Sequence, residues 1–531
     1  SQSEDLPFII RFISSWVRLW MRNINTINMI RKVLIANRGE IAVRVMRSCR
    51  EMGIRSVAVF SEADRTARHV LYADEAVLIG PAASKDSYLN IEKIIRAAKQ
   101  HKVDAIHPGY GFLSENADFA RRCKEEGIVF IGPSAETMEA MGDKISARKR
   151  MIDAGVPVVP GTQQPLQDVG EACRVCREIG FPVMLKASMG GGGKGMRLIH
   201  KEEEVEEAYN AARSESLSSF GDDTVYLEKY VEGPHHIEFQ ILGDRHGNVI
   251  HLCERECSVQ RRNQKIVEET PSPFISEALR RDMGEKAVAA AKAVNYVGAG
   301  TIEFLVDGDG NYFFLEMNTR LQVEHPITEE VLGIDLVKEQ IHIANGRPLR
   351  LRQGDIIQRG HAIECRICAE DTLADFLPAP GIVRQITEPN GIGVRVDSYV
   401  YEGYEIPVFY DPMIGKLIVW ATCREYAIER MRRVLFEYKI TGVKTNIAYL
   451  RRIMDTPDFV TGGYDTGFVE KNAVFLREGY DARDEVCVEV AMIAAYIDYL
   501  MGFEENVTGR TDNRPISRWR AFGIHKGVLR I

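Results

Sequence analysis

The chain has 531 residues and a net charge of −8, a length that accommodates roughly three or four domains. Because Lys and Arg are scattered instead of gathered in long blocks, the negative balance argues against nucleic acid as a partner. Ten cysteines in a chain this long do not make a disulfide framework. We therefore expect reduced thiols in a cytoplasmic protein, and no stretch is long and apolar enough to span a membrane.

The first residues carry an apolar stretch that is difficult to interpret as a secretory signal. Residues 6–21 are apolar, but Arg11 and Arg18 interrupt them, and a signal peptide has a basic start and a small-residue cleavage site. One interpretation is a mitochondrial targeting helix, which would place the protein in the matrix. We favour the other, in which residues 1–28 are a non-essential extension and the first domain begins near Met29.

From Arg31 onward, short apolar strands alternate with helices. An apolar strand at Lys32–Ala36 precedes a helix at Gly39–Glu51, and this alternation predicts a doubly wound α/β domain over residues 29–143. The loop His107–Phe112 follows a strand end, where such folds place ligands. The remaining strands are expected at Ser56–Phe60, Ala76–Ile79, Ala105–Ile106 and Ile128–Ile131, with helices near 90–100 and 115–126.

A run of four glycines, Gly190–Gly193, lies between two predicted strands, Phe181–Lys186 and Met196–Ile199. Such a run lets the backbone approach an anion closely and turn its N–H groups toward it. Neither residue after Lys194 is Ser or Thr, so this is not a Walker A loop. We predict a hairpin lid over phosphates, within residues 157–231.

Two pairs of cysteines have C-x-x-C spacing, Cys173/Cys176 in a predicted helix and Cys365/Cys368 in a predicted strand. Residues three apart in a strand point to opposite faces, so the second pair is a poor chelate, and we do not expect zinc. The stretch Cys257–Lys265 has three cations within five residues, which is typical of a solvated loop. That loop precedes an apolar run and could aim its last lysine inward.

A predicted β-hairpin contains the residues around which the interpretation of the sequence is built. Gly300–Val306 and Tyr312–Glu316 flank Asp307–Asn311, a strong turn signal, and antiparallel pairing brings Glu303 close to Glu316. Facing carboxylates are destabilising unless a cation lies between them, and Mg²⁺ bound to phosphates supplies one. The alternative is a surface hairpin with solvated charges, but both carboxylates lie in apolar runs, where unpaired charge is costly.

Polar residues follow the hairpin at alternate positions. Asn318 adds a neutral oxygen, and Arg320, Gln322 and Glu324 come next. In an extended segment these three side chains share one side, which suits a small anion that must also lose a proton. Predicted helices at 276–295 and 329–345 flank the hairpin.

Beyond Leu349 the chain becomes rich in β-strands. We expect an ATP-binding domain over 144–348, a β-rich domain over 349–474 and a C-terminal extension over 475–531, so that the fold is a multidomain combination of α/β and α+β. The extension contains one apolar helix, Val486–Met501. The strands of the third domain are expected at Gly360–Ala369, Gly381–Ile386, Val394–Val400 and Lys416–Trp420, with helices near 424–438 and 444–455.

Five segments carry a resemblance to a known family: Ile35–Ala42, His107–Asn116, the glycine run, Gln260–Lys265 and Glu316–Pro326. Glu228–Val231 also resembles an adenine-binding edge strand. Together the five segments resemble the biotin carboxylase component of biotin-dependent carboxylases, a member of the ATP-grasp superfamily. The resemblance covers about residues 30–471 and implies a subunit such as the α-type subunit of an acetyl- or propionyl-CoA carboxylase of fatty acid metabolism, with the final carboxyl acceptor left open.

The resemblance implies roles for individual residues. Magnesium or manganese would be held by Glu303, Glu316 and Asn318. Four residues would be catalytic: Glu324 as general base, Arg320, Lys265 and Arg366. Bicarbonate would contact Lys265, Arg320, Gln322 and the N–H of Val323, and biotin would contact Arg366 and Tyr110. The ATP contacts would be Lys144, Lys186, Gly191, Gly192, Gly193, Met196, Glu228, Lys229, Val231, His236, Gln260 and Leu305.

The implied reaction carboxylates biotin with ATP and bicarbonate through carboxyphosphate, and a carboxylate base that touches bicarbonate fits it. The rival interpretations are another ATP-grasp ligase, such as a carbamoyl-phosphate or purine-pathway carboxylating enzyme, and a silent scaffold subunit. No Met is followed directly by Lys, so we expect biotin on a separate carrier protein. The further expected partners are a carboxyltransferase and a second copy of the chain, and the helix Val486–Met501 is expected to dock in that assembly instead of packing on the core.

Overall fold

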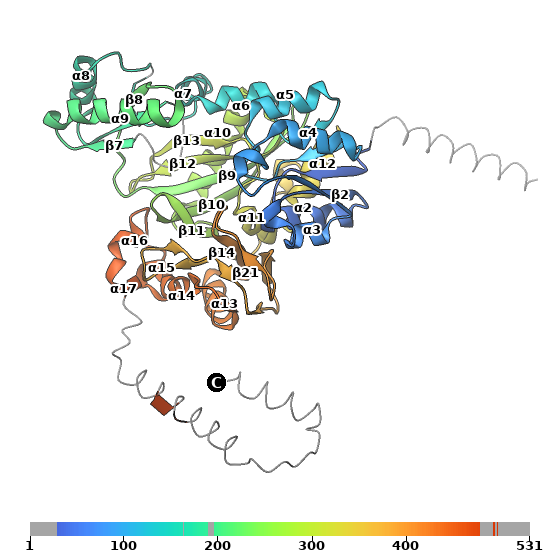
Figure 1. The fold of residues 1–531 in the computed structure, drawn as a ribbon. Helices are drawn as coiled ribbons and strands as arrows, with labels where there is room; N and C mark the ends of the chain where they lie inside the picture. The colour runs from blue at the N-terminus through green and yellow to red at the C-terminus, as the bar shows by residue number, and fades with distance from the viewer. Residues whose placement is uncertain (1–28, 163, 189–195, 478–491, 494–495, 497–531) are drawn as a thin grey trace, which may run out of the picture. The chain divides into compact units, whose positions relative to one another are not determined.

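The structure is a computed structural model that describes residues 29–162, 164–188, 196–477, 492–493 and 496. The chain divides into two compact units, Ser1–Leu476 and Arg477–Ile531. The first unit contains all the sheets described below (Figure 1). Most of the predicted apolar helix Val486–Met501 lies outside the described residues, as do residues 1–28. None of the described helices is long and apolar enough to cross a membrane.

The N-terminal sheet has five parallel strands in the order β3-β2-β1-β4-β5. In β1, Val33 and Ile35 pack with residues of α2 on one face, whereas Leu34 packs with residues of α4 and α5 on the other. Burial on both faces is typical of a parallel sheet, and it confirms the predicted doubly wound domain. The elements are β1 (Lys32–Ile35), α2 (Gly39–Glu51), β2 (Arg55–Ser61), α3 (Arg68–Tyr72), β3 (Glu75–Gly80), α4 (Ile91–Gln100), β4 (Ala105–His107), α5 (Ala117–Glu125) and β5 (Val129–Phe130).

A small antiparallel sheet has the strand order β7-β6-β8, and we call it the lid sheet because β6 and β7 flank the predicted lid. The glycine run Gly190–Gly193 itself lies outside the described residues. It has its own apolar core, to which α8 and α9 contribute, and Figure 1 shows these two helices beside it. The segment that follows α7 joins it to the central sheet, because Val158 pairs with Phe314 and Gly161 pairs with Glu228. The elements are α6 (Ala135–Gly142), α7 (Lys144–Asp153), α8 (Val169–Ile179), β6 (Val183–Ala187), β7 (Met196–Ile199), α9 (Val205–Phe220) and β8 (Val225–Lys229).

The central sheet has eight strands in the order β13-β12-β9-β10-β11-β14-β21-β19, all antiparallel to their neighbours. Its last three strands come from the predicted C-terminal domain, since β11 pairs with β14. The sheet is therefore continuous across the predicted boundary at 348/349. The elements are β9 (His235–Gly243), β10 (Val249–Arg261), β11 (Gln264–Thr270), α10 (Glu277–Ala293), β12 (Gly298–Val306), β13 (Tyr312–Asn318), α11 (His325–Leu332), α12 (Leu336–Ala344), β14 (His361–Cys368), β19 (Val394–Ser398) and β21 (Met413–Ala421).

Helices α13 to α17 and three two-stranded ribbons complete the C-terminal part. The helix α13 packs on β14 and β21 through a large apolar cluster that includes Ile428 and Met431. The elements are β15 (Glu370–Asp371), β16 (Leu377–Pro378), β17 (Gly381–Ile382), β18 (Gln385–Thr387), β20 (Glu405–Ile406), α13 (Arg424–Glu437), β22 (Lys439–Thr441), α14 (Ile447–Asp455), α15 (Pro457–Thr461), α16 (Phe468–Lys471) and α17 (Ala473–Arg477).

Three sequence predictions were wrong in detail. Cys257–Lys265, predicted to be a loop that could aim Lys265 inward, is the end of the β10–β11 hairpin, whose turn residues Arg262 and Asn263 have φ of 50° and 62°. Lys265 does point inward. The predicted helix 329–345 is two helices, because Gly333, with φ of +68°, ends α11 in the left-handed conformation. The predicted strand Gly381–Ile386 divides between β17 and β18.

Candidate active site

The predicted hairpin is present, and its two carboxylates face each other. Glu303 on β12 is the direct cross-strand partner of Glu316 on β13. Only 4% of Glu303 is exposed, so the surface-hairpin alternative was wrong. Burial and the neighbouring Glu303 raise the pKa of Glu316. Burial would also raise the pKa of Glu303, but Lys265 and His236 outweigh it and hold that pKa well below its usual range.

Lys265 is directed inward from the start of β11. Its Nζ lies 3.0 Å from Glu303 Oε1 and 2.7 Å from Glu324 Oε1, and it also donates to Glu238. Burial lowers the pKa of Lys265, but these carboxylates outweigh it and raise the pKa well above its usual value. The lysine therefore stays protonated, and one ammonium links three carboxylates from separate segments.

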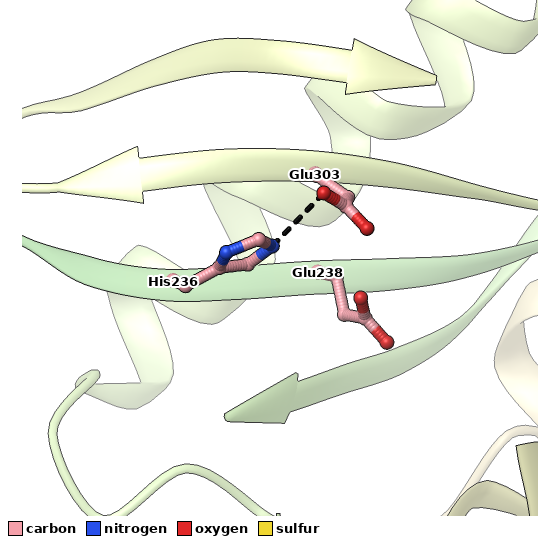
Figure 2. A group of neighbouring side chains, drawn as sticks. All are labelled: His236, Glu238 and Glu303. Carbon is pink, nitrogen blue, oxygen red and sulfur yellow. Dashed lines mark ion pairs between the residues drawn. The ribbon is translucent and has the colours of Figure 1, made fainter. Parts of the chain in front are cut away.

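His236 and Glu238 alternate along β9, so both side chains lie on the same face of the strand. Figure 2 shows them beside Glu303, which is the cross-strand partner of Glu238. His236 Nε2 lies 3.0 Å from Glu303 Oε2. The possible ligand atoms of His236, Glu238 and Glu303 all lie within 4.8 Å of one another, so this group can also accept a cation.

Glu324 is fully buried at the N-terminus of α11. Its Oε1 accepts from Lys265, and its Oε2 accepts from Arg366 Nη2 at 3.1 Å. Burial would raise its pKa, but Lys265, Arg366 and Arg255 outweigh burial and lower the pKa well below the usual range. Glu324 is thus an ionised carboxylate near neutral pH, which is the protonation state that a general base needs.

The loop between β13 and α11 brings the other predicted anion contacts to the same place. Arg320 donates to Gln322 Oε1 at 2.8 Å and to Asn318 Oδ1 at 2.9 Å. Gln322 and Asn318 each donate to Glu303 Oε1, at 2.9 and 2.8 Å. Arg320 also pairs with Glu115 at 2.8 Å. The alternate polar residues therefore converge although the segment is a loop and not a strand.

Some of the predicted nucleotide contacts form a second group on the lid sheet, and others lie on the central sheet or on α7. Lys186 Nζ lies 2.6 Å from Glu228 Oε2, and Arg148 donates to Glu228 Oε1 at 2.8 Å. Lys229 instead donates to the carbonyls of Gly180 and Phe181. The other predicted members are placed as follows: Met196 pairs with Lys186, Leu305 pairs with His236, His236 bonds to Gln260, Lys144 begins α7, Val231 follows β8, and Gly191, Gly192 and Gly193 lie outside the described residues.

Sequence reasoning missed several charged residues that contact this site. Glu238 could have been found, because it lies two residues after His236, and residues at alternate positions of a strand share a face. Glu115 lies inside the segment His107–Asn116, and Glu268 closely follows the segment Gln260–Lys265. The sequence around these two residues does not indicate which residues they contact. Arg148 and Arg255 carry no such signal. Their contacts are Glu238 with Lys265 and Arg255, Glu115 with Arg320, Glu268 with Arg366, and Arg148 with Glu228.

The residues present fit a bound divalent cation. The Glu316 side chain makes no hydrogen bond or ion pair with any described residue, although its pKa is raised by burial and by Glu303. A cation between Glu303 and Glu316 would relieve this repulsion. Carboxylate oxygens are the ligands that Mg²⁺ prefers when phosphates complete its shell.

Comparison with known proteins agrees with this arrangement. Residues 29–138 match the family described as biotin carboxylase, N-terminal domain, and residues 364–471 match the biotin carboxylase C-terminal domain. Between them, residues 143–352 match the carbamoyl-phosphate synthase L chain, ATP binding domain. These matches include most of the residues of the three larger sheets, together with the group around Lys265 and the group around Glu228.

Several relatives are more than half identical to the chain, and two of them are described here. A pyruvate carboxylase subunit of Methanothermobacter thermautotrophicus is 56% identical over 454 residues, which are 86% of this chain and 91% of that protein. The biotin carboxylase of a Nostoc species is 55% identical over 440 residues, covering 83% of this chain and 98% of that protein.

A solved structure is similar along the same length. The biotin carboxylase domain dimer of Hydrogenobacter thermophilus 2-oxoglutarate carboxylase, in complex with MgADP, ADP and bicarbonate, has a TM-score of 0.82 and 51% identity. It matches 85% of this chain and 100% of its own chain. The protein described here belongs to the biotin carboxylase family.

Proposed function

We propose that this chain carboxylates biotin where Lys265, Glu324 and Arg366 meet, with bicarbonate held by this group and ATP held by the lid sheet. As a biotin carboxylase it is an ATP-dependent ligase that uses bicarbonate. The observation that carries the assignment of the site is the fully buried carboxylate of Glu324, bound on one oxygen by Lys265 and on the other by Arg366.

Glu324 is the proposed general base. Bicarbonate must lose its proton as it attacks the γ-phosphorus of ATP, and a base must lie within hydrogen-bond reach of that proton. Lys265, Arg320, Gln322 and the N–H of Val323 would hold the anion. Lys265 and Gln322 already donate hydrogen bonds to Glu303. The anion would therefore bind among side chains that their neighbours hold in place.

Glu303, Glu316 and Asn318 would hold Mg²⁺ or Mn²⁺, which neutralises phosphate charge when it is bound. Lys144, Lys186, His236 and Gln260 would contact the phosphates. Glu228, Lys229 and Val231 would contact adenine. The nucleotide site would be completed by Gly191, Gly192, Gly193, Met196 and Leu305. Phosphoryl transfer depends on such positioning and on cations more than on a covalent nucleophile.

Arg366 is the proposed contact for biotin, together with Tyr110. The carboxyphosphate formed from bicarbonate supplies CO₂, and the phosphate released can take the ureido proton of biotin. The Arg366 guanidinium would then stabilise the enolate-like oxygen that forms on the ring. Its bond to Glu268, at 2.7 Å, fixes its direction.

The partners in the complete reaction are part of the proposal. A separate carrier protein would present biotin, a second copy of this chain would form a dimer, and a carboxyltransferase would pass the carboxyl group to an acyl-CoA. The dimeric Hydrogenobacter thermophilus domain supports the second of these. We also propose a cytoplasmic location, and the mitochondrial alternative gains no support from the relatives.

The rival ATP-grasp ligase is disfavoured because the biotin carboxylase N- and C-terminal families match on both sides of the shared ATP-binding domain. A silent scaffold is disfavoured by the complete set of charged residues, since burying them without use is costly.

The first measurement is ADP release by the purified chain with Mg²⁺, ATP, bicarbonate and biotin, leaving out one component at a time. The second is transfer of the labelled carboxyl group from bicarbonate to biotin. We expect bicarbonate dependence, labelled biotin and stimulation by biotinylated carrier, and Arg366→Ala should remove that stimulation. ATP cleavage that is indifferent to biotin and carrier would contradict the proposal.

A further inference from the structure

Lys416 is a fully buried lysine that the proposed reaction does not use. It lies on β21, directly opposite Arg366 of β14. Its Nζ donates to the carbonyl oxygen of Val323 at 2.8 Å. Removing an ammonium from water is costly unless its partners compensate for the loss, so the identity of those partners shows what the residue does.

Two buried carboxylates lie near Lys416: Glu40 forms an ion pair with it, and Glu364 lies close enough to feel its charge. Glu40 Oε1, at the start of α2, is 3.4 Å from Nζ. The carboxylate oxygens of Glu40 and Glu364 have no hydrogen-bond partner among the described residues. Burial, opposed by Lys416, raises the pKa of Glu40 to about 7. The shorter polar contact of Lys416, at 2.8 Å, is thus with a main-chain carbonyl, and its ion pair with Glu40 is longer.

The Val323 carbonyl that Lys416 holds belongs to the peptide unit between Val323 and Glu324. Because a peptide unit is planar, holding the Val323 carbonyl also fixes the Cα atoms of Val323 and Glu324. Val323 supplies the N–H proposed for bicarbonate, and Glu324 is the proposed base. On the preceding peptide, the Gln322 carbonyl lies 2.8 Å from His325 Nδ1, so consecutive carbonyls of this loop are both held by side chains.

The same ammonium also lies near the proposed biotin contact. Its Nζ is 5.8 Å from the centroid of the Tyr110 ring, within the range of a cation–π contact. The Tyr110 hydroxyl is buried and has no hydrogen-bond partner among the described residues. Lys416 therefore joins the loop that carries the base to the loop that carries Tyr110.

We infer that Lys416 is a positioning residue for carboxylation: its ammonium holds the Val323–Glu324 peptide so that the Val323 N–H and the Glu324 carboxylate both face bicarbonate. The inference rests on the proposed bicarbonate site. It differs from simple charge balance, in which Lys416 would only neutralise Glu40 and Glu364.

Two substitutions of different chemistry test this role. Lys416→Met keeps the length of the side chain without a donor, whereas Lys416→Gln keeps a donor without the charge. We expect Lys416→Met to lower kcat about 10²-fold, the cost of a misplaced reacting group, and to raise the KM for bicarbonate while the KM for ATP stays unchanged. Lys416→Gln should recover part of both losses.

Three further variants make the outcome decisive. Lys286→Met is the matched control, since Lys286 also donates to a main-chain carbonyl, that of Gly155 at 2.9 Å, outside the cluster, and we expect no kinetic change. The double variant Glu40→Gln/Lys416→Met should be no more active than Lys416→Met, and recovery of activity in it would mean charge balance. Glu324→Gln, measured in parallel, tests the bicarbonate site itself.

The results separate the two proposals. Loss of activity in Glu324→Gln with kcat and bicarbonate KM unchanged in folded Lys416→Met would overturn the positioning role alone. Near wild-type turnover in Glu324→Gln would instead overturn the site. Should Lys416→Met not fold, Lys416→Gln decides, because its shorter side chain stretches the bond: a raised bicarbonate KM supports the role, and a wild-type value refutes it.

Discussion

The two sheets that carry the proposed substrate contacts are built differently. On the central sheet, charged side chains are buried and interlocked, as where Lys265 meets carboxylates from three segments. The lid sheet has a separate apolar core and presents one charged trio, formed by Arg148, Glu228 and Lys186. We propose from this difference that the central sheet carries the chemistry, while the lid sheet determines how tightly the nucleotide is held.

The largest expected effect is on the central sheet. Glu324→Gln should leave ATP binding intact and reduce bicarbonate-dependent ATP cleavage about 10²-fold or more, because an amide cannot take the bicarbonate proton. The measurement is ADP release at saturating ATP and bicarbonate, with folding checked by circular dichroism.

Glu254→Gln is a suitable control for that variant. Glu254 is also a fully buried glutamate, but it pairs with Arg280 outside the cluster. We expect it to lower stability and leave kcat unchanged. Equal losses of kcat in the two variants would mean that every buried charge on this sheet is equally important for turnover. The proposed chemical role of the group around Lys265 would then be wrong.

A substitution on the lid sheet should change binding and not chemistry. Lys186→Met removes a charged hydrogen-bond donor, and such a bond contributes enough to raise the KM for ATP roughly tenfold. We expect kcat to stay near the wild-type value. Arg177→Met, which removes an exposed lid ion pair with Glu202, is the control and should change neither constant. If Lys186→Met lowered kcat as much as Glu324→Gln does, the proposed difference in role between the two sheets would be wrong.

A smaller effect concerns the facing carboxylates. Mg²⁺ with nucleotide should raise the Tm of the wild-type chain, because binding to the folded state stabilises it and relieves the repulsion between Glu303 and Glu316. Glu316→Gln should lose most of this gain, as measured by differential scanning fluorimetry with and without Mg²⁺. The same gain in the variant would show that the cation binds elsewhere.

The smallest effect is a dependence of stability on pH. Burial, opposed by Arg366, raises the pKa of Glu268 from 4.5 to about 7. A raised carboxyl pKa means that the folded state binds a proton more tightly than the unfolded state, so stability falls as pH rises from about 4.5 through about 7. Glu268→Gln should therefore gain Tm relative to wild type between pH 5 and pH 8. A constant difference in Tm across that range would contradict this assignment.

Local patterns predicted the parts of the site that lie on one hairpin. A turn signal with alternating flanks was enough to place Glu303 opposite Glu316, and the doubly wound N-terminal sheet followed from alternating strands and helices. The convergence of Gln322 with Glu303 also followed from proximity in the chain.

Pairings between distant segments could not be predicted in this way. The contact between β11 and β14 joins Thr270 to Ala362, and no periodicity in the sequence indicates which strands become neighbours. Arg148 meets Glu228 across 80 residues for the same reason. The charges of Cys257–Lys265 suggested solvent, but they belong to a hairpin whose lysine is neutralised by partners far along the chain.

The most direct test of the central claim is a crystal structure of this chain with Mg²⁺, a non-hydrolysable ATP analogue and bicarbonate. We predict that bicarbonate lies within hydrogen-bond distance of Glu324, Lys265 and Arg320, with the metal between Glu303 and Glu316. Bicarbonate bound away from Glu324, or against the lid sheet while the group around Lys265 stays closed on itself, would contradict the account.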